Sequence, residues 1–251
     1  MKNKKNITRL FFMLVILSCR ISFLHAQQVV NIVLVRKDGI TEDIKKADNF
    51  IVIKSYPNGV FERIEYVLRG PIIQLRTYSD STLAVLSGRV FKYTKKGNLN
   101  VMGNYADNFK TGDWDYLNDS GKVIKKERYE KGVLIDPDVK DTLRKNTTLY
   151  GDERKAVFNH NDKDWQTYLE DHLDLTVVNE SVKGGEVIVD YMINTTGNID
   201  NIHLVKSVEF VLDEAVIKVI QDCPQWIPAF QNGKTLTAYR RQPITFIKER
   251  L

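Results

Sequence analysis

The chain has 251 residues, a hydrophobic fraction of 43% and a formal net charge of +5. This length is enough for one large or two modest domains with ordinary cores. The positive charge does not indicate a nucleic-acid binder, because the first 26 residues contain five basic side chains and no acidic one. The other 32 basic and 32 acidic residues balance, which excludes a general binder of phosphate backbones.

Those first 26 residues have the three parts of a secretory signal peptide. A basic segment ending at Arg9 precedes the apolar run Leu10–Leu17, and Leu24-His25-Ala26 offers a cleavage site. The run is shorter than the ~20 residues that a transmembrane helix needs. We expect cleavage near Ala26. Two alternatives stay open: a lipoprotein whose N-terminus is Cys19, and an uncleaved inner-membrane anchor.

Residues 27–135 carry strand signals and almost no helical period. Two segments share one pattern: Phe91, Tyr93, Gly97 and Tyr105, and then Trp114, Tyr116, Gly121 and Tyr129. A period of about two dozen residues with a turn glycine predicts an antiparallel β meander of hairpins. The pattern resembles the MORN-type repeats of YwqK-like bacterial proteins.

The aromatic residues of these repeats stand two apart, so each pair is expected to share a sheet face. Stacking from hairpin to hairpin would then join Phe91 and Tyr93 with Trp114 and Tyr116 in a continuous aromatic stripe. The plainer interpretation of this stripe is the core of the meander. The alternative is a platform for a glycan, a lipid headgroup or a peptide.

Residues 136–162 are polar and charged and contain few apolar side chains. This composition is typical of a linker. We therefore divide the mature chain into a β-repeat domain over 27–135, a linker over 136–162 and a C-terminal domain over 163–251.

The C-terminal domain alternates between strand and helix periods. Apolar spacings of three and four predict one helix over Asp164–Leu173 and a second that begins near Leu212 and reaches Cys223. Period-two alternation predicts a strand over 185–194 and another over Ile199–Lys206. Asp213 is expected in the first turn of the second helix, where the helix dipole favours negative charge.

Three segments of this domain, in this order along the chain, resemble those of a known protein family. They are the helix LDEAVIKVI (Leu212–Ile220), the motif Trp226-x-Pro228-Ala229, and a closing strand that contains Tyr239-x-x-x-Pro243-Ile244-x-Phe246. Together they resemble the C-terminal domain of TonB, from the envelope of double-membrane bacteria. The resemblance implies an α+β fold of two helices on a three-stranded antiparallel sheet. It also implies binding of outer-membrane TonB-dependent transporters and a motor of the ExbB and ExbD type.

The closing strand, expected over Leu236–Ile247, is the candidate docking edge. Pro243 has no N–H for a sheet ladder and therefore belongs on an edge strand or at a bulge. An edge strand can pair with an extended partner segment through main-chain hydrogen bonds. The candidate partner-binding residues are Leu236, Tyr239, Arg240, Arg241, Pro243 and Thr245.

No motif for catalysis, a cofactor or a metal is evident. Gly233-Lys234-Thr235 resembles the end of a phosphate-binding loop, but Pro228 stands where the first glycine is required. The histidines lack zinc-site spacing. Cys223 is expected to be a small buried hydrophobe on its helix.

We therefore expect a non-enzymatic periplasmic protein that binds outer-membrane transporters or other envelope proteins. One alternative is a membrane-anchored energy transducer coupled to an ExbB/ExbD-type motor. The other is an envelope protein that acts through its β repeats. The chain has only six prolines, and Leu175-Thr176 replaces the Tyr-Pro that usually follows the first helix of the family. Both departures favour the binding protein over the transducer.

Overall fold

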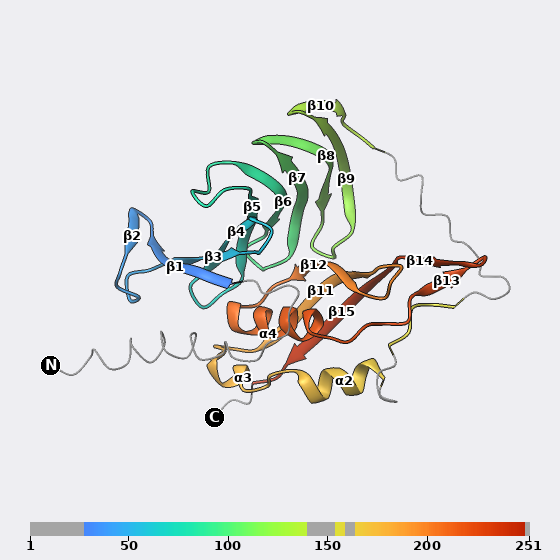
Figure 1. Ribbon diagram of the computed structural model, residues 1–251. Coiled ribbons are helices and arrows are strands. Elements are labelled where there is room, and N and C mark those ends of the chain that lie inside the picture. Colours follow the sequence, from blue (N-terminus) through green and yellow to red (C-terminus); the bar gives the residue numbers. More distant parts are fainter. Residues whose placement is uncertain (1–27, 140–153, 159–163, 249–251) are drawn as a thin grey trace.

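The structure is a computed structural model that describes residues 28–139, 154–158 and 164–248 (Figure 1). The predicted signal peptide and most of the predicted linker lie outside the described residues. The described chain forms a ten-stranded antiparallel meander and a smaller unit with a three-stranded sheet and helices. The predicted α+β organisation is therefore confirmed at this level.

The meander sheet has the strand order β10-β9-β8-β7-β6-β5-β4-β3-β1-β2, so only β2 departs from simple succession. Its strands are β1 (Gln28–Arg36), β2 (Gly39–Thr41), β3 (Asn49–Ser55), β4 (Phe61–Val67), β5 (Ile72–Tyr78), β6 (Leu86–Tyr93), β7 (Leu99–Ala106), β8 (Phe109–Leu117), β9 (Val123–Glu130) and β10 (Val133–Asp136).

One type of tight turn recurs along the meander. Gly59, Gly97 and Gly121 all have positive φ, at 79°, 83° and 73°. Each glycine N–H donates to the carbonyl three residues earlier, and the flanking residues close the hairpin with a second bond. Glycine adopts this left-handed conformation without the cost that a Cβ adds. The turn glycines predicted from the repeat pattern, Gly97 and Gly121, are confirmed.

The predicted continuous aromatic stripe is wrong. Phe91 stands opposite Met102, and Met102 stands opposite Asp115, so Phe91 shares a face with Asp115. Trp114 is the next residue and points to the other face. The cause is the register shift of the β6–β7 ladder between Lys92 and Tyr93, where one extra residue of β7 reverses the alternation beyond it.

Two separate aromatic groups result. Trp114 is 2% exposed and packs edge-on against Tyr105 at 5.3 Å and Tyr129 at 6.1 Å. Phe91 instead stacks on His203 of the C-terminal unit at 5.3 Å. Trp114 is thus core of the meander, whereas Phe91 helps to join the two units.

The C-terminal unit contains a three-stranded antiparallel sheet of order β12-β11-β15, and a short separate hairpin. Its elements are α2 (Trp165–His172), α3 (Val177–Glu180), β11 (Gly185–Ile193), β12 (Ile199–Lys206), α4 (Phe210–Gln221), β13 (Ala229–Gln231), β14 (Lys234–Leu236) and β15 (Ala238–Phe246). The short helix α3 was not predicted from the sequence.

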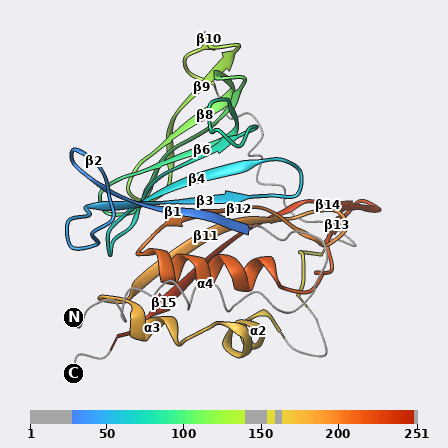
Figure 2. The same cartoon turned by 60° about the vertical axis from the view of Figure 1, so that its left-hand side comes forward.

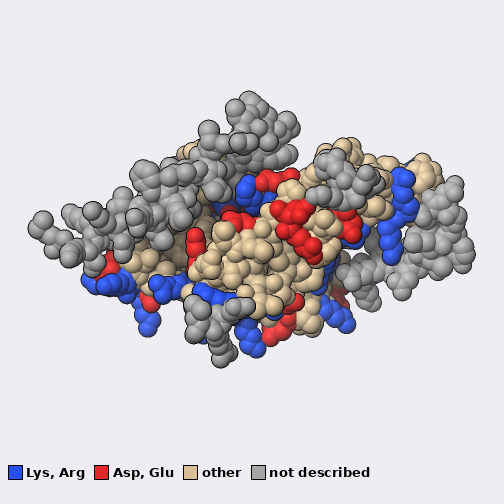
Figure 3. Space-filling model, turned by 90° about the horizontal axis from the view of Figure 1, so that it is seen from below, with Lys and Arg blue, Asp and Glu red and all other residues tan. Residues whose placement is uncertain are grey.

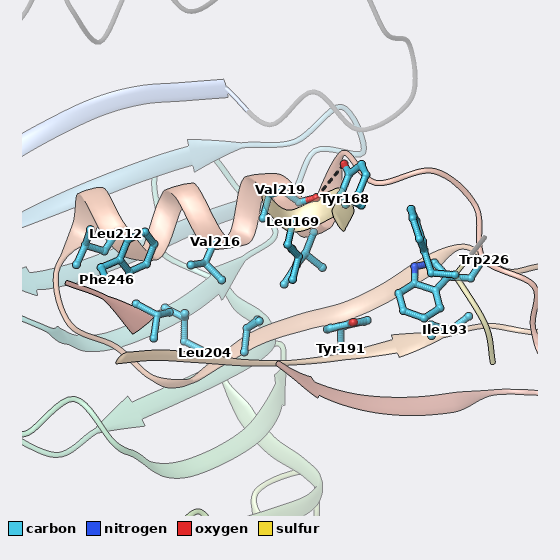
Figure 4. Packing of buried hydrophobic residues seen from close by; sticks show 14 of the residues in the cluster. Tyr168, Leu169, Tyr191, Ile193, Leu204, Leu212, Val216, Val219, Trp226 and Phe246 are labelled. Atoms are coloured by element: carbon cyan, nitrogen blue, oxygen red, sulfur yellow. Dashed lines mark hydrogen bonds between the residues drawn. The ribbon is translucent and has the colours of Figure 1, made fainter. Parts of the chain in front are cut away.

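Helix α4 supplies most of the apolar contact with this sheet (Figure 4). Leu212, Val216 and Ile220 recur every four residues on one helical face, and each is fully buried. Burying one such side chain contributes about 1.5–3 kcal/mol. Helix α2 lies beside α4, where the Tyr168 hydroxyl donates to the Val219 carbonyl at 3.3 Å.

Part of the predicted linker belongs to this unit. Arg154 and Val157 form antiparallel bridges with Phe230 and Ile227. Phe158 is 5% exposed and packs in the core beside Trp226, with ring centroids 5.3 Å apart. The described residues 154–158 are therefore a strip along β13.

The meander rests on the face of the small sheet opposite α4 (Figure 2). Backbone contacts join them, because Asn98 forms a bridge with Lys206 and the Ser207 N–H donates to the Gly97 carbonyl at 2.9 Å. The Lys54 ammonium, 3% exposed, contacts both carboxylate oxygens of Glu214 at 2.7 Å.

An aromatic contact adds to this junction. Phe210 of α4 meets Phe50 and Tyr66 of the meander edge-on, at 5.6 and 5.4 Å. Such pairs stabilise beyond their buried area by about 0.5–1.5 kcal/mol each. The two units are thus held together by backbone, ionic and aromatic contacts.

Candidate functional site

The outer edge of β15 is the candidate site. β15 pairs with β11 along its whole length, from Ala238 opposite Ile193 to Phe246 opposite Gly185. No strand of the described chain pairs with its other side. The predicted edge position is confirmed by this strand order. Alternate main-chain N–H and C=O groups of an edge strand lack a ladder partner, so this edge is a template for an added strand.

Side chains of β15 alternate between two faces, as a strand requires. Four of the six candidate residues lie on the face turned away from the helices: Tyr239, Arg241, Pro243 and Thr245. Tyr239 is 79% exposed. Pro243 stands opposite Ile188 in this edge ladder, which is the kind of position that tolerates proline.

The two arginines have partners inside the chain. Arg241 makes a two-pronged contact with Asp190, its neighbour on β11, with both N–O distances at 2.8 Å. This pairing raises the pKa of Arg241. Arg240 donates to the Ala156 carbonyl and lies over the Trp226 ring, 5.1 Å from its centroid. Both side chains therefore have structural contacts at the edge.

The predicted inclusion of Leu236 in the closing strand is wrong. Leu236 ends β14, where it stands opposite Ala229 of β13. Asn232 and Gly233, both with positive φ, form the tight turn of this hairpin. A break then separates β14 from β15. Leu236 is 40% exposed and lies beside the start of the docking edge.

A groove of about 370 Å³ opens at this end of β15. Its lining brings together three candidate residues, Leu236, Tyr239 and Arg240, with Arg154 and Phe230. Neither Arg154 nor Phe230 was predicted from the sequence. Arg154 and Phe230 come together because residues 154–158 pair with β13, which is far away in the chain. Neither segment has a local pattern that specifies its partner.

Gln242 connects the edge to the helical layer. Its Oε1 accepts a hydrogen bond from Trp165 Nε1 at 2.8 Å. Trp165 opens α2, and the Asp164 carboxylate caps this helix by accepting from the Thr167 N–H at 2.9 Å. These contacts fix the inner face of β15 and leave its outer edge open.

The Cys223 thiol is a packing group near this site. Cys223 lies just past the end of α4 and is half-buried, so it is less enclosed than predicted and outside the helix. Burial raises the pKa of its thiol to about 11, which keeps it protonated and weakly nucleophilic. Among the described residues, no cluster of three or more His, Cys, Asp or Glu could hold a metal ion.

None of the described helices has the length and apolar character needed to cross a membrane.

The part of the chain that contains β15 matches a known family. The family model for the Gram-negative bacterial TonB protein C-terminal matches residues 179–247. The searches of curated proteins and of solved structures returned no match. The matched segment spans the whole three-stranded sheet, α4 and the β13–β14 hairpin. It suggests a TonB-like role in protein interaction at the cell envelope. Residues 179–247 are thus similar to the C-terminal domain of Gram-negative bacterial TonB proteins.

Proposed function

We propose that this protein is a non-enzymatic binding module of the periplasm. It docks extended segments of outer-membrane transporters or other envelope proteins by adding them as strands to β15. The observation that carries this proposal is the outer edge of β15, which no described strand covers. In strand addition, main-chain hydrogen bonds give affinity and alternate side chains give selectivity.

The meander supports this assignment by contacting the opposite side of the small sheet, at β12. It closes part of the β12 edge through the bridge between Asn98 and Lys206. It also contacts the face opposite α4, where Phe91 stacks on His203 and the Arg89 guanidinium donates to the Ile202 carbonyl at 3.2 Å. A partner strand is therefore directed to β15.

The N-terminus decides between a binding protein and a motor-coupled transducer. We expect mass spectrometry of the protein isolated from cells to find a chain that begins at Gln27. Such a chain has lost the basic and apolar segments that would form an anchor. A start at lipidated Cys19 would instead give a lipoprotein, and an intact N-terminus would favour coupling to an ExbB/ExbD-type motor.

Photocrosslinking in cells tests the docking edge. A photoreactive phenylalanine analogue placed at Tyr239, which is 79% exposed on β15, is expected to capture an envelope protein. The same analogue at Ile40, which is 74% exposed on β2 of the meander, is the matched control. Capture of the same partner from position 40 alone would assign binding to the β repeats and contradict the proposal.

The captured partner then allows a quantitative test. Tyr239→Ala should weaken its binding by about tenfold, because exposed tyrosines at an interface often contribute 1 kcal/mol or more. Ile40→Ala should leave the dissociation constant unchanged. Both substitutions are on the surface and should change the free energy of unfolding by only about 0.5 kcal/mol.

A further inference from the structure

All charged side chains that line the groove at the start of β15 are basic. We infer that this groove binds an acidic side chain at one end of the partner segment that adds to β15. This inference rests on the proposed function, since the partner segment is positioned by the strand edge. Three of the groove's ten lining residues are basic, Arg154, Lys155 and Arg240, and none is Asp or Glu.

The guanidinium of Arg154 is the main candidate to receive a carboxylate. It lies over the Phe230 ring, 5.6 Å from the centroid, and its backbone is fixed by two hydrogen bonds with Phe230, at 3.0 and 2.9 Å. A guanidinium held against an aromatic ring keeps N–H groups available in a planar fork that matches a carboxylate. Phe230 thus orients Arg154 at the groove.

Arg240 and Lys155 add to the same positive field. Arg240 already donates to the Ala156 carbonyl, so its role in the groove is long-range attraction rather than a new two-pronged contact. Blue side chains gather at the end of the molecule where Figure 1 places β13 and β14 (Figure 3). A negative group near this end would be attracted, and less so at high salt.

The groove meets only one end of an added strand. Its β15 residues are Ala238, Tyr239 and Arg240, at the start of the strand. The far end of β15 pairs with Gly185, roughly 27 Å away for eight residue steps along a strand. The acidic preference should therefore fall at one terminal position of the bound segment and be absent from the rest.

Selection from a library of random nonapeptides displayed on phage tests this preference. The purified wild-type protein should enrich Asp or Glu at one terminal position of the bound peptides. Changing that acid to its amide should weaken binding by up to about fivefold, the upper end of the range for an exposed ion pair, and the difference should shrink at high salt. Arg154→Gln should abolish the preference while the same peptides still bind.

Lys183→Gln is the matched control. Lys183 is exposed and precedes Gly185, at the opposite end of the β11–β15 pair. The acidic preference should survive this change. A rival occupant is the chain's own acidic sequence Asp152-Glu153, next to Arg154. If replacing these two by Asn and Gln tightens acidic peptides about as much as Arg154→Gln weakens them, the groove is internally occupied and the inference is overturned.

The remaining outcomes separate the two proposals. Peptides that crosslink to position 239 but show no terminal acid preference would overturn the groove inference and leave strand addition standing. No enrichment over a library passed through without protein would overturn both. An acidic preference that depends on Arg154 in peptides that fail to crosslink to position 239 would contradict strand addition and, with it, this use of the groove.

Discussion

Replacing Gly97 by alanine should lower the free energy of unfolding by about 3 kcal/mol or more. Gly97 lies in the β6–β7 turn with φ at 83°, and a Cβ there would be 2.2 Å from the Ser207 carbonyl oxygen and 2.8 Å from Pro71 Cβ. Both neighbours are constrained, one as backbone and one as a ring. The added methyl group therefore has to displace the meander from the C-terminal unit.

The matched control is Gly59→Ala in the equivalent β3–β4 turn. Gly59 has nearly the same φ, at 79°, but no atom lies within 4 Å of the position that a Cβ would take there. The substitution should cost only the left-handed backbone strain of about 1–2 kcal/mol. Urea unfolding of the two variants therefore separates backbone strain, which they share, from contact between the units, which only Gly97 makes.

Gly121→Ala should fall between these two. A Cβ at Gly121 would be 3.2 Å from Val205 Cγ1 and 3.3 Å from an Arg241 guanidinium nitrogen, both on side chains that can shift. Equal losses for all three substitutions would mean that the turns contribute only local strain. That result would contradict the junction described between the meander and the small sheet.

Local patterns predicted most of the elements in the small unit. The strand over 185–194 and the strand over Ile199–Lys206 correspond closely to β11 and β12, and the two amphipathic segments correspond to α2 and α4. These predictions succeeded because one buried face imposes a period of two or 3.6 residues on the sequence. The same is true of the turn glycines, since positive φ selects glycine locally.

The errors arose where distant segments decide the outcome. The aromatic stripe failed because a bulge shifts the register of β6 and β7, and bulges leave little trace in sequence. The groove was missed because residues 154–158 pair with β13. Asp213 lies in the first turn of α4, as predicted, but its burial was not predicted: the meander covers that end of α4 and leaves Asp213 0% exposed.

The free energy of unfolding should depend on pH through the ionisation of Asp213, and this is the second large effect that we expect. The Asp213 carboxylate accepts hydrogen bonds from the Ser207 hydroxyl and from the Val208 N–H, the latter at 3.1 Å. Burial nevertheless raises its pKa to about 7, and the nearby charge of Glu214 adds to the increase. The nearby Glu214 is itself paired with the Lys54 ammonium.

The direction of this pH dependence follows from how many protons the folded and unfolded chains bind. Between the ordinary aspartate pKa of 3.8 and about 7, folded Asp213 keeps a proton that the unfolded chain releases. Its contribution to stability is complete below the unfolded pKa and is lost as pH rises toward 7. The loss has an upper bound of roughly 4 kcal/mol, from 1.36 kcal/mol for each pKa unit.

Asp213→Asn isolates this contribution. Asparagine keeps the shape and an accepting oxygen for the Val208 N–H, and its amide can donate to the Ser207 hydroxyl oxygen. It carries no charge at any pH. Urea unfolding of both proteins from about pH 4.5 to 7.5 should show the wild type losing stability relative to the variant as pH rises.

The difference in stability between the wild type and Asp213→Asn also excludes the contributions of other titrating groups. Burial lowers the pKa of His203, so this residue gives stability that rises with pH toward its unfolded value, opposite in sign to Asp213. Glu127 has its pKa lowered to about 2 by its bonds with Lys125 and Tyr116, so its contribution falls only at lower pH. Both are common to the two proteins and cancel in the difference. Parallel stability curves would mean that folded Asp213 titrates as it does in the unfolded chain, and would contradict a pKa raised by burial at this junction.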